Sequence, residues 1–400
     1  MNRADVQGLL FSGYVARPCS ALLVLRFARG RPNAWLRRIL WQVSSGAASE
    51  RHDPFRLNLA FTYLGLEKLC LPAPTLAGFS REFRQGMAHP ERSLALGDHP
   101  ASDPEQWDFA DGGARGVDGV ALVYARSSTE LQEKLGELEQ GLRHFQLESE
   151  CLLTYLPSDR REHFGFGMGG SEPKVRGFGG RALTRSRLAR GEFLLGYADG
   201  VGDRQRGPVA PARRTTREPL AMAGAGSVDF GFNGSYLVIR KLEQQVEAFR
   251  AFIEAAGEGV ARELCAAHVR RANPREALTG DARDSDRHRL LRRGRLYGAS
   301  TDSGPVERGL LFVALNADLA RQFEQVQGQW LARGALPGLR GEPDPLLGPA
   351  SSVTLQGEPV RRRLSGLAPW VRVRGGLYGF LPSVRALGYL ADLDESRVQP

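Results

Sequence analysis

The sequence contains few cysteines and no metal-binding cysteine pair. Cys19, Cys70, Cys151 and Cys265 are the four cysteines of the 400 residues, and none of them forms a Cys-x-x-Cys pair. This spacing argues against a zinc or iron–sulfur site. A disulfide framework is not expected in a chain of this length either. We therefore expect a protein of a reducing compartment.

Long apolar segments are also missing. No stretch reaches the roughly 18 apolar residues that a membrane helix requires. The first residues, MNRADVQGLLFSGY, contain neither the apolar core of a secretory signal nor a twin-arginine run. Together these absences predict a cytoplasmic protein without a membrane segment.

The charge balance is basic, with 54 Lys+Arg against 45 Asp+Glu and a formal net charge of +9. Arginine supplies nearly all of the positive charge. This excess favours an anionic partner, such as nucleic acid, a membrane surface or an anionic cofactor. No run interleaves basic and aromatic residues as nucleic-acid modules do, so we do not expect nucleic acid.

Apolar periodicity predicts an α+β fold with helices packed on antiparallel sheets. Strands are expected at residues 5–14, 21–27, 56–61, 119–124, 148–155, 234–240, 309–315 and 371–380. Helices are expected at residues 33–45, 62–69, 76–87, 127–145, 241–256, 319–331 and 382–389. The segment 88–116, rich in Asp, Gly, His and Pro, is expected to be a surface loop.

Residues 156–228 differ from the rest because glycine, arginine and proline dominate and periodicity fades. A segment this long without regular structure is usually functional or disordered. We therefore predict an N-terminal unit at residues 1–160, a connecting segment at 161–228 and a C-terminal unit at 229–400.

One stretch, Cys265-Ala-Ala-His268-Val-Arg-Arg-Ala-Asn-Pro-Arg275, places a lone histidine in a helix-like apolar run followed by arginines. A second basic run follows at 287–295. An imidazole can hold iron and guanidinium groups can pair with propionates, so this pattern suits a flat, dianionic, iron-bearing ligand. An ordinary core histidine beside a solvated basic face explains the same spacing.

Further stretches extend this pattern over nearly the whole chain. They are Gly191-Glu-Phe-Leu-Leu-Gly-Tyr197, Asn233-Gly-Ser-Tyr-Leu-Val-Ile-Arg240, Leu290-Leu-Arg-Arg-Gly-Arg-Leu-Tyr-Gly298 and Gly309-Leu-Leu-Phe-Val-Ala-Leu-Asn-Ala-Asp318. Together with the histidine stretch they resemble the dye-decolorising (Dyp-type) haem peroxidase family. The resemblance implies two ferredoxin-like units of the dimeric α+β barrel type. It also implies haem b (iron protoporphyrin IX), with hydrogen peroxide and an organic reductant as substrates. A homo-oligomer is compatible with it.

The resemblance also implies roles for single residues. His268 would be the proximal iron ligand, and Arg292 would lie on the distal face, aimed at bound peroxide. Arg293 takes that place if the register shifts by one. Arg270, Gly165 and Gly169 are further predicted haem contacts. A carboxylate usually accepts the other N–H of a ligating histidine, and Asp318 and Glu324 are the candidates.

The chain departs from the family at the Gly-x-x-Asp-Gly motif, which falls on Gly165-Phe-Gly-Met168-Gly169. A distal carboxylate can move a proton between the two peroxide oxygens, which is worth roughly 10²–10⁴-fold in rate. Methionine cannot exchange that proton. Two alternatives keep peroxidase activity: Arg292 with water is sufficient, or Glu172 or Asp199 replaces the acid. Alternatively the chain is a non-catalytic haem-binding, sensor or electron-transfer protein, with Met168 as a candidate sixth iron ligand.

Overall fold

The computed structural model describes residues 1–28, 30–47, 53–168, 172–178, 188–213, 219–257, 259–273, 282–298, 307–336, 341–355 and 360–393. Its N-terminal half is an antiparallel sheet in the order β5-β1-β4-β2. The strands are β1 (Cys19–Arg26), β2 (Phe55–Phe61), β4 (Gly119–Ala125) and β5 (Glu148–Tyr155). The helix α1 (Pro32–Ile39) follows β1, and α6 (Ser128–His144) follows β4. This is the strand order and connection pattern of a ferredoxin-like unit.

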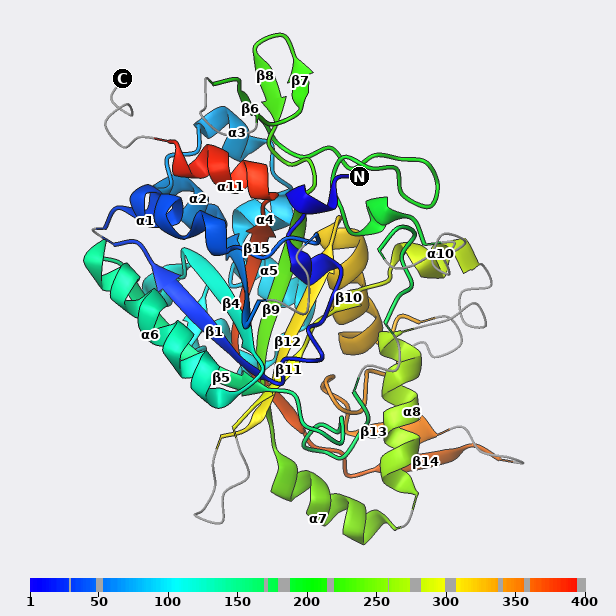
Figure 1. The fold of residues 1–400 in the computed structure, drawn as a ribbon. Coiled ribbons are helices and arrows are strands. Elements are labelled where there is room, and N and C mark those ends of the chain that lie inside the picture. Colours follow the sequence, from blue (N-terminus) through cyan, green and yellow to red (C-terminus); the bar gives the residue numbers. More distant parts are fainter. Residues whose placement is uncertain are drawn as a thin grey trace.

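The C-terminal half repeats the plan in the order β11-β12-β9-β15. Its strands are β9 (Ser235–Gln244), β11 (Arg295–Tyr297), β12 (Gly309–Asn316) and β15 (Val371–Leu381), and the short β10 (Leu291–Arg292) also pairs with β12. The helices α7 (Val246–Ala256) and α8 (Val260–Ala272) follow β9, and the π-helix η9 (Leu319–Ala332) follows β12. Figure 1 shows α8 and η9 on one side of these strands.

The two sheets join at both edges and close a ring of strands. Leu296 of β11 pairs with Tyr155 of β5, and Phe380 of β15 pairs with Phe61 of β2. This topology confirms the predicted α+β fold of two ferredoxin-like units.

Side chains alternate along the strands between an inner and an outer core, as the two-residue period of a strand requires. In β1, Leu22 and Val24 belong to the inner cluster, whereas Leu23 and Leu25 belong to the outer one. Strands from both halves supply the inner cluster, so the two units share a core. Its strand members are Leu22, Val24, Ala60, Phe109, Val120, Leu122, Tyr124, Leu237, Ile239, Leu291, Leu311, Val313, Leu315, Leu377 and Leu381.

Smaller elements decorate this frame. They are α2 (Tyr63–Lys68), α3 (Ala73–Ala77), α4 (Arg81–Gln85), α5 (Pro90–Leu96), α10 (Ala282–Arg287), α11 (Val384–Ala391), the strand β3 (Phe109–Ala110), the sheet of β6 (Val209–Pro211), β7 (Met222–Gly224) and β8 (Ser227–Asp229), the hairpin of β13 (Ser352–Leu355) and β14 (Arg362–Ser365), and single 3-10 turns that include η1 (Arg3–Asp5), η2 (Gly8–Leu10), η5 (Pro104–Gln106) and η8 (Arg190–Glu192).

Four predictions of local structure were wrong. The expected strand 5–14 instead contains the turns η1 and η2. The side chains of Gln7 and Asn58 form hydrogen bonds with backbone groups that a neighbouring strand would otherwise bond. The expected helix 76–87 is two helices, and the Ser80 hydroxyl caps the second by accepting the N–H of Phe83. Residues 241–244 extend β9 because both neighbouring strands pair with it.

The fourth wrong prediction is the loop at residues 88–116, which contains α5 and β3. Pro90 occupies the first turn of α5, where a missing N–H has no cost, and the His89 ring accepts the N–H of Glu91. The turn-forming residues of this segment therefore led to the prediction of a loop where a short helix forms.

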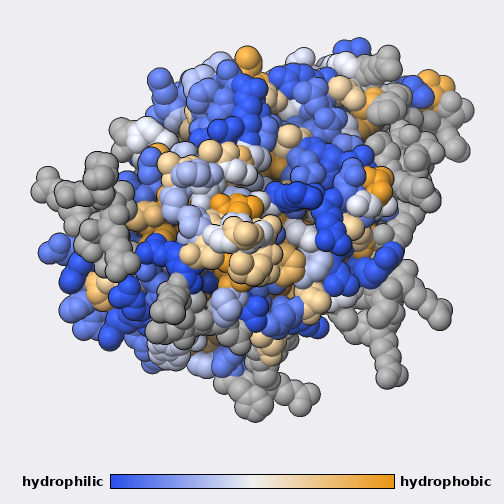
Figure 2. Space-filling model, turned by 90° about the horizontal axis from the view of Figure 1, so that it is seen from above, coloured by the Kyte–Doolittle hydropathy of each residue, from blue (hydrophilic) through white to orange (hydrophobic). Residues whose placement is uncertain are grey.

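Figure 2 shows the molecule from the end that carries α3, α11 and the β6–β8 sheet. Hydrophilic side chains cover most of this face, and apolar ones gather in small patches. Among the described residues, no helix has both the length and the apolar character needed to cross a membrane.

Candidate functional site

The candidate site is a cavity in the C-terminal half, bounded by α8, η9, β9, β12, residues 160–168 and Glu172. The cavity has a volume of about 380 Å³. Its walls combine apolar side chains with several arginines. The lining includes Glu162, Phe164, Phe166, Gly167, Met168, Glu172, Leu242, Gln244, Cys265, His268, Asn273, Leu290, Arg292, Arg293, Arg295, Phe312, Phe323, Val326, Leu331, Leu346 and Leu347.

His268 projects from α8 into this cavity, and its ring is held from behind by Asp344. Its Nδ1 lies 3.0 Å from Oδ2 of Asp344, whose side chain is fully buried. The other oxygen of Asp344 accepts the backbone N–H groups of Leu346 and Leu347, each at 2.9 Å. With Nδ1–H donated to the carboxylate, Nε2 is the nitrogen left to bind a metal.

The electrostatics of this pair favour an ionised carboxylate. Burial alone would raise the pKa of Asp344, but the electrostatic interaction and hydrogen bond with His268 and the hydrogen bonds from two backbone N–H groups outweigh burial. The pKa of Asp344 therefore lies below its usual range.

Neither carboxylate expected behind His268 occupies that place. Asp318 caps η9, with its Oδ1 accepting the N–H of Arg321 at 2.9 Å. Glu324 accepts the Tyr378 hydroxyl at 2.8 Å and pairs with Arg92 at 2.9 Å. Both are therefore occupied elsewhere, and Asp344 corrects the expectation.

Arg292 comes from β10 and lines the same cavity as His268. Its Nη2 donates to the carbonyl of Ala272, the last residue of α8, at 2.7 Å. Burial, with a smaller contribution from nearby Arg289, lowers the pKa of Arg292 to about 10. No carboxylate in the described part of the chain pairs with it. A half-buried guanidinium that has no carboxylate partner among the described residues suits an anionic ligand.

Arg293, which was expected in place of Arg292 if the register shifted by one, uses its side-chain donors in contacts within the fold. Its Nε donates to the carbonyl of Leu9 at 2.8 Å, its Nη2 to that of Leu10 at 3.1 Å, and its Nη1 contacts Glu172. Its donors therefore fix the N-terminal turns against β10, whereas those of the neighbouring Arg292 are largely unused.

The glycine-rich loop carries Met168 to the cavity. Met168 is half-buried, lines the cavity and donates its N–H to the carbonyl of Arg160 at 2.7 Å. Gly165 is exposed, with a φ of 96° that favours glycine, and does not line the cavity. Gly169 lies outside the described residues. Arg270 is exposed on α8 and is not among the lining residues either.

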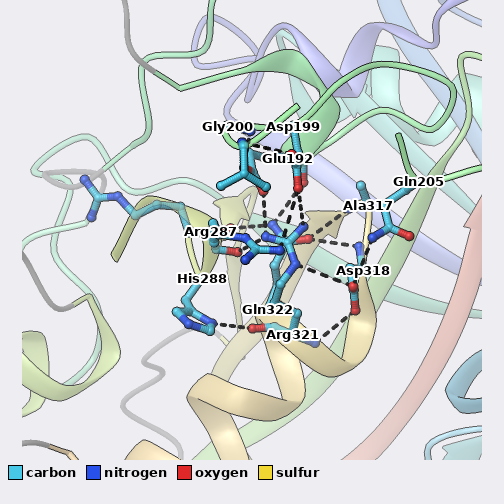
Figure 3. A network of polar contacts seen from close by, with 12 residues as sticks. Glu192, Asp199, Gly200, Gln205, Arg287, His288, Ala317, Asp318, Arg321 and Gln322 are labelled. Carbon is cyan, nitrogen blue, oxygen red and sulfur yellow. Dashed lines mark hydrogen bonds and ion pairs between the residues drawn. The ribbon is translucent and has the colours of Figure 1, made fainter. Parts of the chain in front are cut away.

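Of the acids expected to replace the distal aspartate, only Glu172 lies at the cavity. Asp199 belongs to a separate network, in which it lies 3.9 Å from both Arg287 and Arg321 (Figure 3). In the same network Arg321 pairs with buried Glu192 at 2.9 Å (Figure 3). Asp199 is therefore removed as a candidate for the distal acid.

Sequence reasoning missed one further acid at the cavity, Glu162. Its two oxygens accept the backbone N–H groups of Phe166 at 2.7 Å and of Phe164 at 3.0 Å, and it also contacts the Gln244 amide. These contacts assign it to shaping the loop that carries Met168. Its position directly before His163 in the loop motif was the only available signal.

The donor set at this cavity suits a cofactor that brings most of its own metal ligands. Among the residues that the structure describes, no group of three or more His, Cys, Asp or Glu side chains could hold a metal ion. A single imidazole in an apolar slot with a free guanidinium fits haem, whose macrocycle supplies four nitrogens. Asn273 also lines this cavity, and its Nδ2 is buried without a hydrogen-bond partner.

Comparisons with known proteins agree with this geometry. Residues 192–337 match the family model "Dyp-type peroxidase, C-terminal". The chain is 28% identical over 309 residues to the multifunctional dye peroxidase DyP2 of Amycolatopsis, covering 60% of this chain and 63% of that protein, which is less than two thirds of its length. It is 25% identical over 424 residues to Peroxidase 2 of Mycetinis scorodonius, covering 83% of this chain and 75% of that protein.

Solved structures share the fold. The Dyp-type peroxidase of Anabaena matches with a TM-score of 0.73 at 22% identity, over 97% of this chain and 94% of that one. A fungal Dyp-type peroxidase from Auricularia auricula-judae matches with a TM-score of 0.74 at 18% identity, over 98% and 99%. The family model thus matches residues 192–337, and solved structures of Dyp-type peroxidases share the fold of this chain.

Proposed function

We propose that the protein is a haem-dependent peroxidase that oxidises an organic reductant with hydrogen peroxide, at a rate reduced by the methionine at position 168. The observation that carries this proposal is one cavity that collects His268 from α8, Arg292 from β10 and Met168 from the glycine-rich loop. The family support for residues 192–337 adds to it.

Haem b would be held in this cavity, where its iron would supply the redox chemistry with peroxide. His268 would bind the iron through Nε2, because Asp344 accepts the proton of Nδ1. Apolar side chains such as Leu242, Phe312 and Phe323 would pack against the macrocycle and exclude water. Arg270, Gly165 and Gly169, predicted as haem contacts, gain no support from the described cavity lining.

Arg292 is proposed to stabilise the negative charge that develops as the O–O bond of peroxide breaks. A fixed, desolvated guanidinium is effective in this role because it needs no reorganisation during the reaction. The accompanying proton transfer lacks the usual carboxylate, since Met168 has no exchangeable proton. Glu172 or water must carry this proton, and we expect a slow reaction as a result.

A second function has one observation in its favour. The thioether of Met168 lines the same cavity as His268, and histidine–methionine ligation of haem iron is typical of electron-transfer proteins with a raised potential. The alternative is therefore a non-catalytic haem-binding, sensor or electron-transfer protein on the same fold.

The Met168→Asp variant separates the two functions. If the missing carboxylate limits the rate, the second-order rate constant with hydrogen peroxide should rise by up to about 10²–10⁴-fold, measured by stopped-flow absorption of the haem-loaded protein. Met222→Asp, at an exposed methionine of β7, is the matched control. A wild-type protein that is inert to peroxide, with no gain in Met168→Asp, contradicts the peroxidase proposal and favours the alternative.

We also propose a reducing, cytoplasmic compartment, which the four unbonded cysteines support. The organic reductant is proposed only as a class, and homo-oligomerisation stays a prediction.

A further inference from the structure

A second cavity lies in the N-terminal half, and it shares no lining residue with the first. It is lined by residues of α2, α4, the start of α5 and the segment 104–115. The cavity has a volume of about 600 Å³. Nothing in the proposed peroxidase chemistry uses this space, although its walls carry arginines and aromatic rings.

Two guanidinium groups at this cavity lack a carboxylate partner. Arg84, on α4, makes no side-chain hydrogen bond or ion pair with any described residue. Arg115 contacts only the carbonyl of Trp107. By contrast Arg81, on the same helix, pairs with Glu91 at 2.6 Å. Arg84 and Arg115 are therefore available to an anionic ligand, and guanidinium groups favour carboxylates through paired N–H donors.

One wall of the cavity is aromatic. Tyr63 of α2 and Phe83 of α4 lie edge to face, with ring centroids 6.3 Å apart, and both line the cavity. Phe83 is buried, whereas Tyr63 is half-buried and presents surface to the space. A flat aromatic ligand would gain contact area here at little cost in side-chain entropy.

We propose that this second cavity binds an aromatic carboxylate. Its carboxylate would pair with Arg84 and Arg115, and its ring would lie against Tyr63. The exposed carboxylate of Glu105 also lines the cavity and repels such a ligand. The site is independent of the haem cavity, so its failure would leave the proposed function intact.

Isothermal titration calorimetry of the full-length protein with 4-hydroxybenzoate tests this site. We expect measurable binding that Arg84→Gln weakens by about tenfold, because one charge-assisted hydrogen bond is lost. Arg84 holds no part of the fold, so this variant should stay folded. Arg81→Gln makes the same charge change on the same helix outside the cavity and should leave affinity unchanged. Glu105→Gln should tighten binding.

Three results overturn the proposal. The first is no binding to the wild-type protein, and the second is equal binding to Arg84→Gln and wild type. The third is binding that Arg292→Gln abolishes, which would place the ligand in the first cavity.

Discussion

His268 and Asp344 form the contact that most directly decides what the first cavity can bind. The family resemblance identified His268 in the sequence, but Asp344 could not be found there. It lies 76 residues away in a Pro-rich segment without periodicity, so no spacing links the two. Asp318 and Glu324 were expected because they stand in a recognisable helix. Local sequence patterns give no information about a hydrogen bond between two distant segments.

Replacing Asp344 with Asn should weaken haem binding by about 10–100-fold. An amide facing Nδ1 either leaves its N–H without an ionised acceptor or donates to it, which moves the ring proton to Nε2 and blocks the metal-binding nitrogen. Haem titration of the apoprotein, followed by absorption, measures the effect. Asp318→Asn is the control because it makes the same change at a carboxylate that caps η9 and is not among the lining residues of the cavity. Equal haem affinity in both variants would show that Asp344 does not orient His268.

The same carboxylate makes stability depend on pH. Its pKa is lowered in the folded protein from an ordinary value of 3.8, so its stabilising contribution is complete above that value. The contribution is lost as pH falls through the lower folded pKa. The difference in unfolding free energy between wild type and Asp344→Asn should therefore be constant near neutral pH and shrink below about pH 4. Urea unfolding at several pH values measures it, and a difference that grows in acid would reverse the sign.

The helix η9 forms one wall of the first cavity and is anchored by charge. Residues 319–331 were predicted as a helix from their periodicity, and the helix is found, although it is wound as a π-helix. Its attachment was not predictable. Arg321 donates to Glu192, a residue of the turn η8 that lies 129 positions earlier in the chain (Figure 3). The sequence shows both charges and gives no sign that they meet.

Arg321→Met should destabilise the protein by about 3–5 kcal/mol, because it leaves the buried carboxylate of Glu192 without its cation. The free energy of unfolding in urea is the measurement. Arg26→Met removes a partly exposed pair with Glu150 and should cost less than about 1 kcal/mol. A loss below about 1 kcal/mol for Arg321→Met would mean that the network does not anchor η9.

The closed ring of strands makes the two halves one structural unit. Periodicity located most strands to within a few residues, since their alternation is a local property. The contacts that close the ring, Leu296 with Tyr155 and Phe380 with Phe61, join distant segments and have no local signature. The boundaries predicted at 160 and 229 therefore stay a prediction about the sequence, while the inner core is shared.

Leu237→Ala should destabilise both halves together. Leu237 is fully buried in the inner cluster, so the cavity it leaves should cost about 2–5 kcal/mol. Hydrogen exchange should show the same loss of protection in β1 and β4 of the N-terminal half as in β9. Leu94→Ala, at an exposed leucine, should change little. Loss of protection confined to the C-terminal strands would show that the halves unfold separately.

Haem titration of the apoprotein of the wild type and of His268→Ala tests the central claim most directly. The account predicts a single haem site in the wild type, and a loss in His268→Ala that exceeds the about 10–100-fold expected for an outer contact. His144→Ala, at an exposed histidine of α6, should bind haem like the wild type. Equal affinity and an unchanged absorption spectrum in His268→Ala would contradict the account.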